Sequence, residues 1–143
     1  MASLAFEDLG TQFQVNGSAE VYEETTPRSP TTIIRRDQAW KVQFDWRSFG
    51  SLNHMIAGNW YLRIYLEQMG LGEFNLPNAS ATVAIVSNLN SSNYNRDILV
   101  PANTVPAGLY KLVASVTCKG PLGHPGPVAG FAEGPLVQFY DAV

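Results

Sequence analysis

The sequence has a single cysteine, Cys118, among 143 residues, which excludes an internal disulfide and with it a secreted disulfide-framework domain. Charged residues are also scarce, at 15% of the chain where about 25% is usual. Nine basic against twelve acidic residues give a net charge of −3. Because this balance leaves no basic surface for phosphate groups, we expect no nucleic-acid partner.

Long hydrophobic runs are absent too. No stretch approaches the roughly 20 consecutive apolar residues of a membrane span, so we expect no membrane partner. The opening residues 1–8 have no basic region, and Glu7 interrupts their apolar run, which is unlike a secretory signal peptide and predicts a cytoplasmic protein. Apolar residues make up 45% of the chain, enough for one core. We expect one domain over residues 1–143, with residues 1–10 loosely packed.

The common catalytic and metal-binding motifs are missing. The only histidines, His54 and His124, lie in predicted loops outside any hydrolase, zinc or phosphate-binding motif. Two histidines and one cysteine, far apart in sequence, are too few ligands for a zinc site. Cys118 lies on the apolar face of a predicted strand, which favours a buried, unreactive thiol. We therefore expect no catalytic residue, no metal site and no cofactor.

What the sequence does contain is apolar residues at every second position, the pattern of a half-buried β-strand. Three segments show it clearly: Ala39–Arg47, Asn59–Glu67 and Gly108–Cys118. In the first two, alternation assigns eight large side chains to the core. They are Trp40, Val42, Phe44, Trp46, Trp60, Leu62, Ile64 and Leu66.

Further segments have weaker strand patterns, separated by turn-forming residues. The weaker strands are predicted at Thr11–Val15, Ala19–Tyr22, Thr31–Arg36, Ala81–Ser87, Tyr94–Val100 and Pro135–Tyr140. Asn16-Gly17 and the prolines and glycines of 121–127 are predicted turns. Only Phe49–Ile56 has helical spacing, enough for one or two turns. Some eight or nine short strands with little helix predict an all-β, antiparallel sandwich of two sheets.

The segment Ile98–Thr117, ILVPANTVPAGLYKLVASVT, resembles the corner between strands E and F of immunoglobulin-like and fibronectin type III-like domains. The resemblance implies an immunoglobulin-like sandwich of about seven to nine strands in Greek-key order. It also implies that Tyr110 is the corner tyrosine, whose hydroxyl returns to the backbone a few residues upstream. Leu112 stands where antibody domains have a cysteine, so the inter-sheet disulfide of that family is absent.

One predicted sheet face carries residue types that are frequent in protein interfaces. Tyr61, Arg63 and Tyr65 occupy outward positions of one strand, and Leu109 and Val113 those of another. Apolar residues on both faces of these strands indicate that one face is covered, by a partner subunit or by the chain's own residues 5–13. We therefore interpret the chain as a non-enzymatic interaction or assembly module, forming a homodimer through this face or an edge strand.

Two alternatives stay open. The polar run from Ser87 has the amides and the aromatic ring that a carbohydrate or small-ligand site uses, and also the composition of an ordinary turn. Its candidate residues are Asn88, Asn90, Asn93, Tyr94 and Asn95. An enzyme of unrecognised type would use His54, His124 or a loop carboxylate. A sugar site predicts an exposed aromatic shelf, whereas an enzyme predicts a pocket with a perturbed ionisable group.

Overall fold

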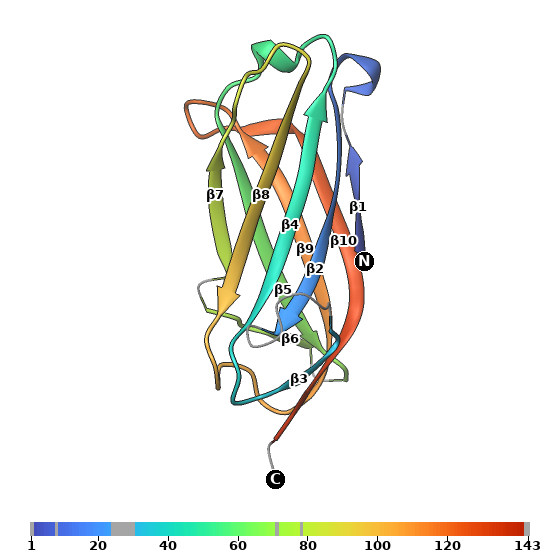
Figure 1. Cartoon of the computed structure of the whole chain (residues 1–143), viewed down its shortest axis with the longest axis vertical. Coiled ribbons are helices and arrows are strands. Elements are labelled where there is room, and N and C mark those ends of the chain that lie inside the picture. Colours follow the sequence, from blue (N-terminus) through green and yellow to red (C-terminus); the bar gives the residue numbers. More distant parts are fainter. Residues whose placement is uncertain (1, 8, 24–30, 71, 78, 142–143) are drawn as a thin grey trace.

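The computed structural model describes residues 2–7, 9–23, 31–70, 72–77 and 79–141, which form strands and two short 3₁₀ turns (Figure 1). The strands are β1 (Ala2–Glu7), β2 (Gln14–Glu23), β3 (Ile33–Arg35), β4 (Trp40–Phe49), β5 (Asn59–Gln68), β6 (Gly72–Phe74), β7 (Ser80–Ala84), β8 (Ser91–Val100), β9 (Gly108–Lys119) and β10 (Pro125–Tyr140). The turns are η1 (Gly10–Gln12) and η2 (Asn53–Met55). The predicted all-β class is confirmed. In these ranges no helix has the length and hydrophobicity needed to span a membrane.

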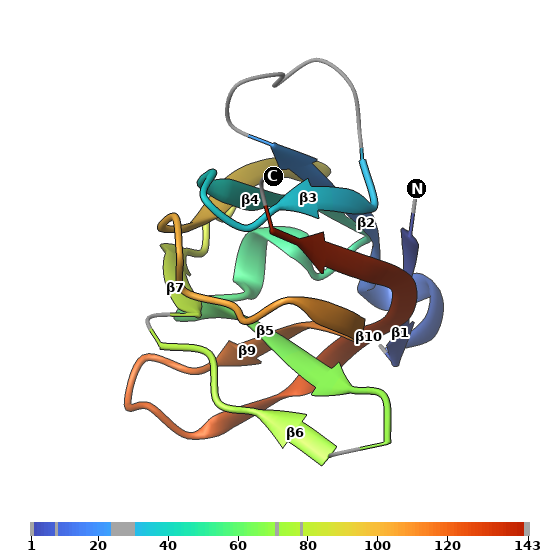
Figure 2. The same ribbon diagram turned by 90° about the horizontal axis from the view of Figure 1, so that it is seen from below.

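The strands are hydrogen-bonded into one curled sheet in the order β6-β5-β9-β10-β1-β2-β4-β8, with β7 also on β5 and β3 on β10. All pairs are antiparallel except β3 with β10. Seen from below, β2 and β4 lie opposite β5 and β9 (Figure 2). The predicted division into two separate sheets is not found, because β1 pairs with β2 through residues 2–4 and with β10 through residues 5–7.

Strand β1 was not predicted from the sequence, which suggested a loosely packed segment there. Leu4 is buried, and Phe6 packs its ring against Gly130 of β10, where a Cβ would overlap the ring. Phe13, just after η1, is also buried in the core. These residues therefore extend the sheet and fill its interior. The alternative in which residues 5–13 cover the outer face of β5 and β9 is wrong for the described chain.

The predictions around Asn16-Gly17 are also wrong. Only Gln14 and Val15 of the predicted strand Thr11–Val15 belong to a strand, since residues 10–12 form η1 and β2 begins at Gln14 and runs without a turn through Gly17. Gly17 lies opposite Leu4 of β1 and opposite Trp46 of β4. A Cβ on Gly17 would lie 2.5 Å from the Asp45 carbonyl oxygen and 2.7 Å from the Trp46 Cβ. Glycine is needed here for close approach of the strands, not for a turn.

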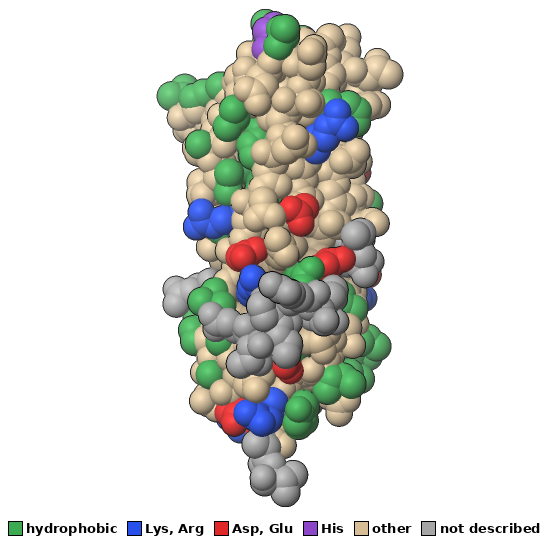
Figure 3. All heavy atoms as spheres, in the orientation of Figure 1, with side chains coloured by type: hydrophobic (Ala, Val, Ile, Leu, Met, Phe, Trp, Pro, Cys, Tyr) green, Lys and Arg blue, Asp and Glu red, His purple; other side chains and the backbone are tan. Residues whose placement is uncertain are grey.

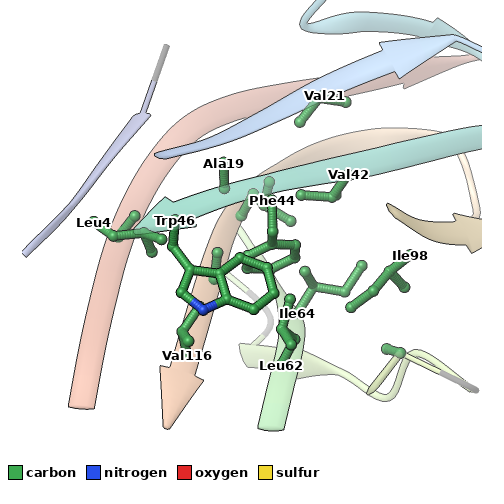
Figure 4. Close-up of a cluster of buried hydrophobic side chains, with 14 of the residues drawn as sticks. Leu4, Ala19, Val21, Val42, Phe44, Trp46, Leu62, Ile64, Ile98 and Val116 are labelled. Carbon is green, nitrogen blue, oxygen red and sulfur yellow. The ribbon is translucent and has the colours of Figure 1, made fainter. Parts of the chain in front are cut away.

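All eight side chains assigned to the core by alternation are buried, which confirms the predicted faces of β4 and β5. Side chains of β2 and β4 meet those of β5 and β9 across the interior (Figure 4). The Trp46 ring stacks on Tyr94 of β8, with centroids 5.2 Å apart, and meets Trp60 of β5 edge to face at 6.2 Å. Aromatic rings thus join the two halves of the curled sheet.

The corner geometry implied for Tyr110 is confirmed. The side chain is fully buried, and its hydroxyl donates to the Pro106 carbonyl at 2.9 Å, four residues upstream. Burial raises the pKa of Tyr110. The ring packs edge to face against Phe139 of β10 and Phe74 of β6. Tyr110 therefore links the loop before β9 to the core.

We predict that Tyr110→Phe lowers the free energy of unfolding by about 1–3 kcal/mol, because the partly buried hydrogen bond from the Tyr110 hydroxyl to the Pro106 carbonyl is lost. Urea denaturation measures the change. Tyr140→Phe is the matched control, since Tyr140 is exposed and its substitution should cost less than about 0.5 kcal/mol. Equal stability of the two variants would contradict a structural role for the Tyr110 hydroxyl.

We also predict that Gly17→Ala destabilises the protein by roughly 1–3 kcal/mol, because the added methyl group overlaps the backbone of Asp45 and forces β2 away from β4. Ser18→Ala, at the next position but on the outer face of β2, should change the stability by less than about 0.5 kcal/mol. The same urea titration compares them. An unchanged midpoint for Gly17→Ala would mean that the strands have room at this pair.

Candidate functional site

The strongest candidate surface is the outer face of β5, β9 and β10, which lie side by side. Three rows of residues run across it. They are Arg63, Ser115 and Phe131; Tyr65, Val113 and Glu133; and Glu67, Lys111 and Leu136. We call these nine residues, together with Tyr61, the β5–β9–β10 face. Phe131 and Leu136 are about half exposed, so the face combines apolar and aromatic side chains with a few charges.

The charges of this face lie close to its aromatic rings. The Arg63 guanidinium lies over the Tyr65 ring, 4.8 Å from the centroid, and Lys119 lies over Tyr61 at 4.6 Å. Lys111 forms an ion pair with Glu133 at 3.0 Å. Within the described chain, Arg63 has no carboxylate partner. Its positive charge is therefore held over an aromatic ring and free to meet an anion.

Next to Tyr65 the surface has a depression of about 310 Å³, lined by Tyr65, Leu66, Glu67, Glu73 and Val113. Glu67 of β5 lies directly opposite Glu73 of β6. Like charges opposite each other in a sheet are destabilising. Neither carboxylate has an ion-pair partner among the described residues. The depression is therefore suited to accept a cationic side chain.

Four of the five residues proposed for the interaction surface, Tyr61, Arg63, Tyr65 and Val113, lie together on this face. The fifth residue, Leu109, is exposed at the beginning of β9, where it lies opposite Gln138 of β10. Phe131 and Leu136 were not found from the sequence. Phe131 lies before the predicted strand Pro135–Tyr140, and a shift in register between Glu133 and Leu136 places an extra residue in β10, so the alternation does not continue from one part of β10 to the other.

The polar-loop alternative predicted an exposed aromatic residue, and that expectation is wrong for Tyr94. Asn88, Asn90, Asn93 and Asn95 are exposed, but Tyr94 points into the core. Its hydroxyl accepts a hydrogen bond from the Val86 amide at 3.0 Å and donates to the Val86 carbonyl at 3.2 Å. The ring therefore joins β8 to the chain after β7 and is not a shelf for a sugar.

Asn93 and Asn95 lie instead on the outer face of β2, β4 and β8, where the Asn95 amide donates to the Asp45 carboxylate at 2.6 Å. An open hollow of about 310 Å³ on this face is lined by Asn16, Gly17, Ser18, Asp45, Trp46, Arg47, Asn93 and Tyr94. Both aromatic residues of this hollow, Trp46 and Tyr94, are buried, so its surface is polar and has no exposed ring.

The residues considered for an enzyme or metal site are not brought together. His54, on η2, and His124, before β10, are both exposed. The described residues contain no group of three or more His, Cys, Asp or Glu side chains that could hold a metal ion. Cys118 is buried as predicted, and burial raises the pKa of its thiol, which disfavours the reactive thiolate.

A buried polar network at one end of the sheet was missed by the sequence analysis. Asn53 of η2 is buried, and its Oδ1 accepts a hydrogen bond from the Ser48 hydroxyl at 2.6 Å. Its Nδ2 donates to the Asn88 carbonyl at 2.8 Å and to the Ser92 hydroxyl at 3.1 Å. The Ser92 hydroxyl in turn donates to the Val86 carbonyl. The network fixes η2 against the segment between β7 and β8.

Comparison with known proteins gives fold-level neighbours alone. No protein-family model matches the chain, and no curated protein matches its sequence. A CARDB domain from Pyrococcus furiosus, solved with di-metal ions, is 13% identical, covers 94% of this chain and 95% of its own, and has a TM-score of 0.42. The soluble domain of PmoD from Methylocystis sp. is 13% identical, covers 98% of both chains and has a TM-score of 0.40.

A putative ApaA protein from Bordetella pertussis is 11% identical, covers 90% of this chain and 96% of its own, and has a TM-score of 0.40. Similarity at this level does not extend to functional residues.

We predict that Asn53→Ala destabilises the protein by at least about 1–3 kcal/mol, since it leaves the Ser48 hydroxyl and the Asn88 carbonyl without their partner. Asn90→Ala, an exposed asparagine of the neighbouring loop, is the control and should be neutral. Thermal unfolding compares the two, and amide hydrogen exchange should show faster exchange at residues 50–58 only in Asn53→Ala. Identical exchange in both variants would show that the network does not hold the loops.

Proposed function

We propose that this chain is a non-enzymatic, immunoglobulin-like interaction module that assembles as a homodimer through the β5–β9–β10 face. One observation carries the proposal. On and beside this face lie Arg63, which has no carboxylate partner among the described residues, and Glu67 and Glu73, which form no ion pair with a described residue; the cation and the two carboxylates lie on opposite sides of Tyr65. A second copy of the same face is the simplest partner that satisfies both.

The immunoglobulin-like assignment rests on Tyr110 and on two buried tryptophans. The buried Tyr110 hydroxyl bonds back to Pro106, which is the geometry of a tyrosine corner. Trp40 and Trp46 lie in the core between the two halves of the sheet. The single curled sheet is compatible with a sandwich in which β1 passes from one half to the other.

Symmetry supports a face-to-face dimer. Arg63 and Glu67 are each two residues from Tyr65 along β5, or about 6.6 Å in an extended strand. A two-fold axis in the interface, crossing the strands at Tyr65, would set Arg63 of each copy above the Glu67–Glu73 depression of the other. Tyr65 and Val113 would then form an apolar centre around the axis, as in isologous interfaces.

The sheet edge is a poorer candidate for self-association. Arg96 on the edge strand β8 occupies an inward position, between Tyr94 and Ile98, yet its side chain is exposed. Inward-pointing charges on edge strands disfavour pairing with another chain. The outer face of β2, β4 and β8 is occupied mainly by amides and charges, such as Gln43, Asp45 and Arg47. The β5–β9–β10 face is the apolar exception.

Charge reversal tests this arrangement. We predict that the wild-type chain sediments as a dimer at micromolar concentration. Either Arg63→Glu or Glu67→Arg alone should raise the dissociation constant of the dimer by about thirtyfold or more, because each variant places like charges at positions 63 and 67 opposite each other. Mixing the two variants in equal amounts should restore a dimer, since residues 63 and 67 then carry opposite charges at both of the contacts between them. Analytical ultracentrifugation measures all three samples.

The control is Arg47→Glu, which reverses an arginine that lies over an aromatic ring, Phe49, on the opposite half of the sheet. It should dimerise like the wild type. A monomeric wild type at micromolar concentration contradicts the proposed function. If the wild type is a dimer but the mixed charge variants do not dimerise, the chain still self-associates, and the proposed face and symmetry are wrong.

A further inference from the structure

A second surface lies at one end of the sheet, where four connections gather: residues 9–13 with η1, 50–58 with η2, 85–90 and 120–124 (Figure 1). We call it the loop end. These four segments contain no Asp, Glu, Lys or Arg, and their only ionisable side chains are His54 and His124. At the uppermost end of the molecule, Figure 3 shows a histidine and hydrophobic side chains without an acidic one.

The tips of these loops expose large apolar side chains. Met55 is 68% exposed, Leu89 70% and Leu122 86%, each on a different loop. Val86 and Leu9 add further exposed apolar surface. Exposed polar residues without charge, such as Asn88, lie between them. The three most exposed apolar side chains, Met55, Leu89 and Leu122, therefore project from three different loops.

The loops support one another at their bases. The Ile85 amide donates to the Gly58 carbonyl at 3.0 Å, and the Ser87 hydroxyl donates to the Ile56 carbonyl at 2.5 Å. Gly58 touches the backbone of Lys119 and Gly120 so closely that a Cβ there would overlap it.

On the other side of the loop end, the Leu52 amide donates to the Gln12 carbonyl at 2.9 Å. Together with the Asn53 network, these contacts hold the apolar loop tips in position before any ligand binds, so binding would cost little conformational entropy.

We propose that the loop end binds the surface of a phospholipid bilayer by inserting Met55, Leu89 and Leu122 among the lipids. A bilayer interface accepts separate apolar side chains to a depth of about 5–10 Å, whereas a protein partner needs a continuous complementary surface. Uncharged tips lose no ionic hydration on insertion, and the neighbouring amides can bond to headgroups. The expectation of no membrane partner rested on the lack of a spanning segment, which surface binding does not need.

This binding is independent of the proposed dimer. The loop end lies at one end of the long axis, whereas the β5–β9–β10 face lies along it, and the chain leaves β10 at the opposite end (Figure 1). Since charged groups are absent from the four loops, attraction to lipid should be driven by apolar contact. We therefore expect binding to zwitterionic vesicles with little dependence on salt.

Co-sedimentation with phosphatidylcholine vesicles tests the proposal. The wild type should pellet with the vesicles, and the triple variant Met55→Ser, Leu89→Ser, Leu122→Ser should bind at least tenfold more weakly. The matched control changes three similarly exposed apolar residues outside the loop end, Ile33→Ser, Met69→Ser and Leu99→Ser, and should bind like the wild type. A wild type that stays in the supernatant, or a loop variant that still binds fully, overturns the proposal.

A second measurement reports insertion directly. In Leu122→Trp, the new indole should be quenched by brominated phosphatidylcholine, while the buried Trp40, Trp46 and Trp60 should not be. Absence of quenching at position 122 overturns insertion. Binding only to anionic phosphatidylserine vesicles, lost at high salt, would assign the attraction to charges elsewhere and also overturns it. A triple variant that loses dimerisation without any vesicle effect would assign the loop end to protein contact instead.

Discussion

The aromatic contact of Trp46 with Tyr94 and Trp60 is the interaction on which the rest of the structure depends. The curled sheet has two open edges, β8 on one side and β6 with β7 on the other, and no backbone ladder joins them in the described chain. Trp46 and Tyr94 stack at 5.2 Å, and both rings meet Trp60 on the far half. The Tyr94 hydroxyl then bonds to both backbone groups of Val86. Side chains therefore bring together edges that the backbone leaves apart.

The packing of these aromatic rings between the two sheet edges, which we call the closure, determines which surfaces are left exposed for binding other molecules. With Tyr94 turned inward, the polar run before and around it has no exposed aromatic ring, which weakens the sugar-binding alternative. The Asn53 network sits directly above the closure and holds the loops that carry Met55 and Leu89. Away from it, Arg63 and the Glu67–Glu73 pair are exposed and form no ion pair with the described residues. The β5–β9–β10 face and the loop end are thus two separate surfaces of a sheet held together by the same core.

The sequence predicted those parts of the candidate surface that follow from alternation within one strand. Tyr61, Arg63 and Tyr65 share the outward face of β5 because successive side chains of a strand point to opposite sides. It did not predict Phe131 and Leu136, since Phe131 lies before the predicted strand and an extra residue in β10 breaks the alternation between its two parts. The sequence places Glu67 and Glu73 on either side of a glycine-containing turn, but their position directly opposite each other follows only from the pairing of the three-residue strand β6 with β5.

The sequence by itself determined the class of the fold, the buried faces of β4, β5 and β9, and the corner at Tyr110, because each depends on residues a few positions apart. Only the tertiary structure decided that Gly17 lies inside a strand and not in a turn, that residues 2–7 join the two halves of the sheet, and that four loops meet at one end. Those features depend on strand partners distant in sequence, and local periodicity contains no information about which strands will meet.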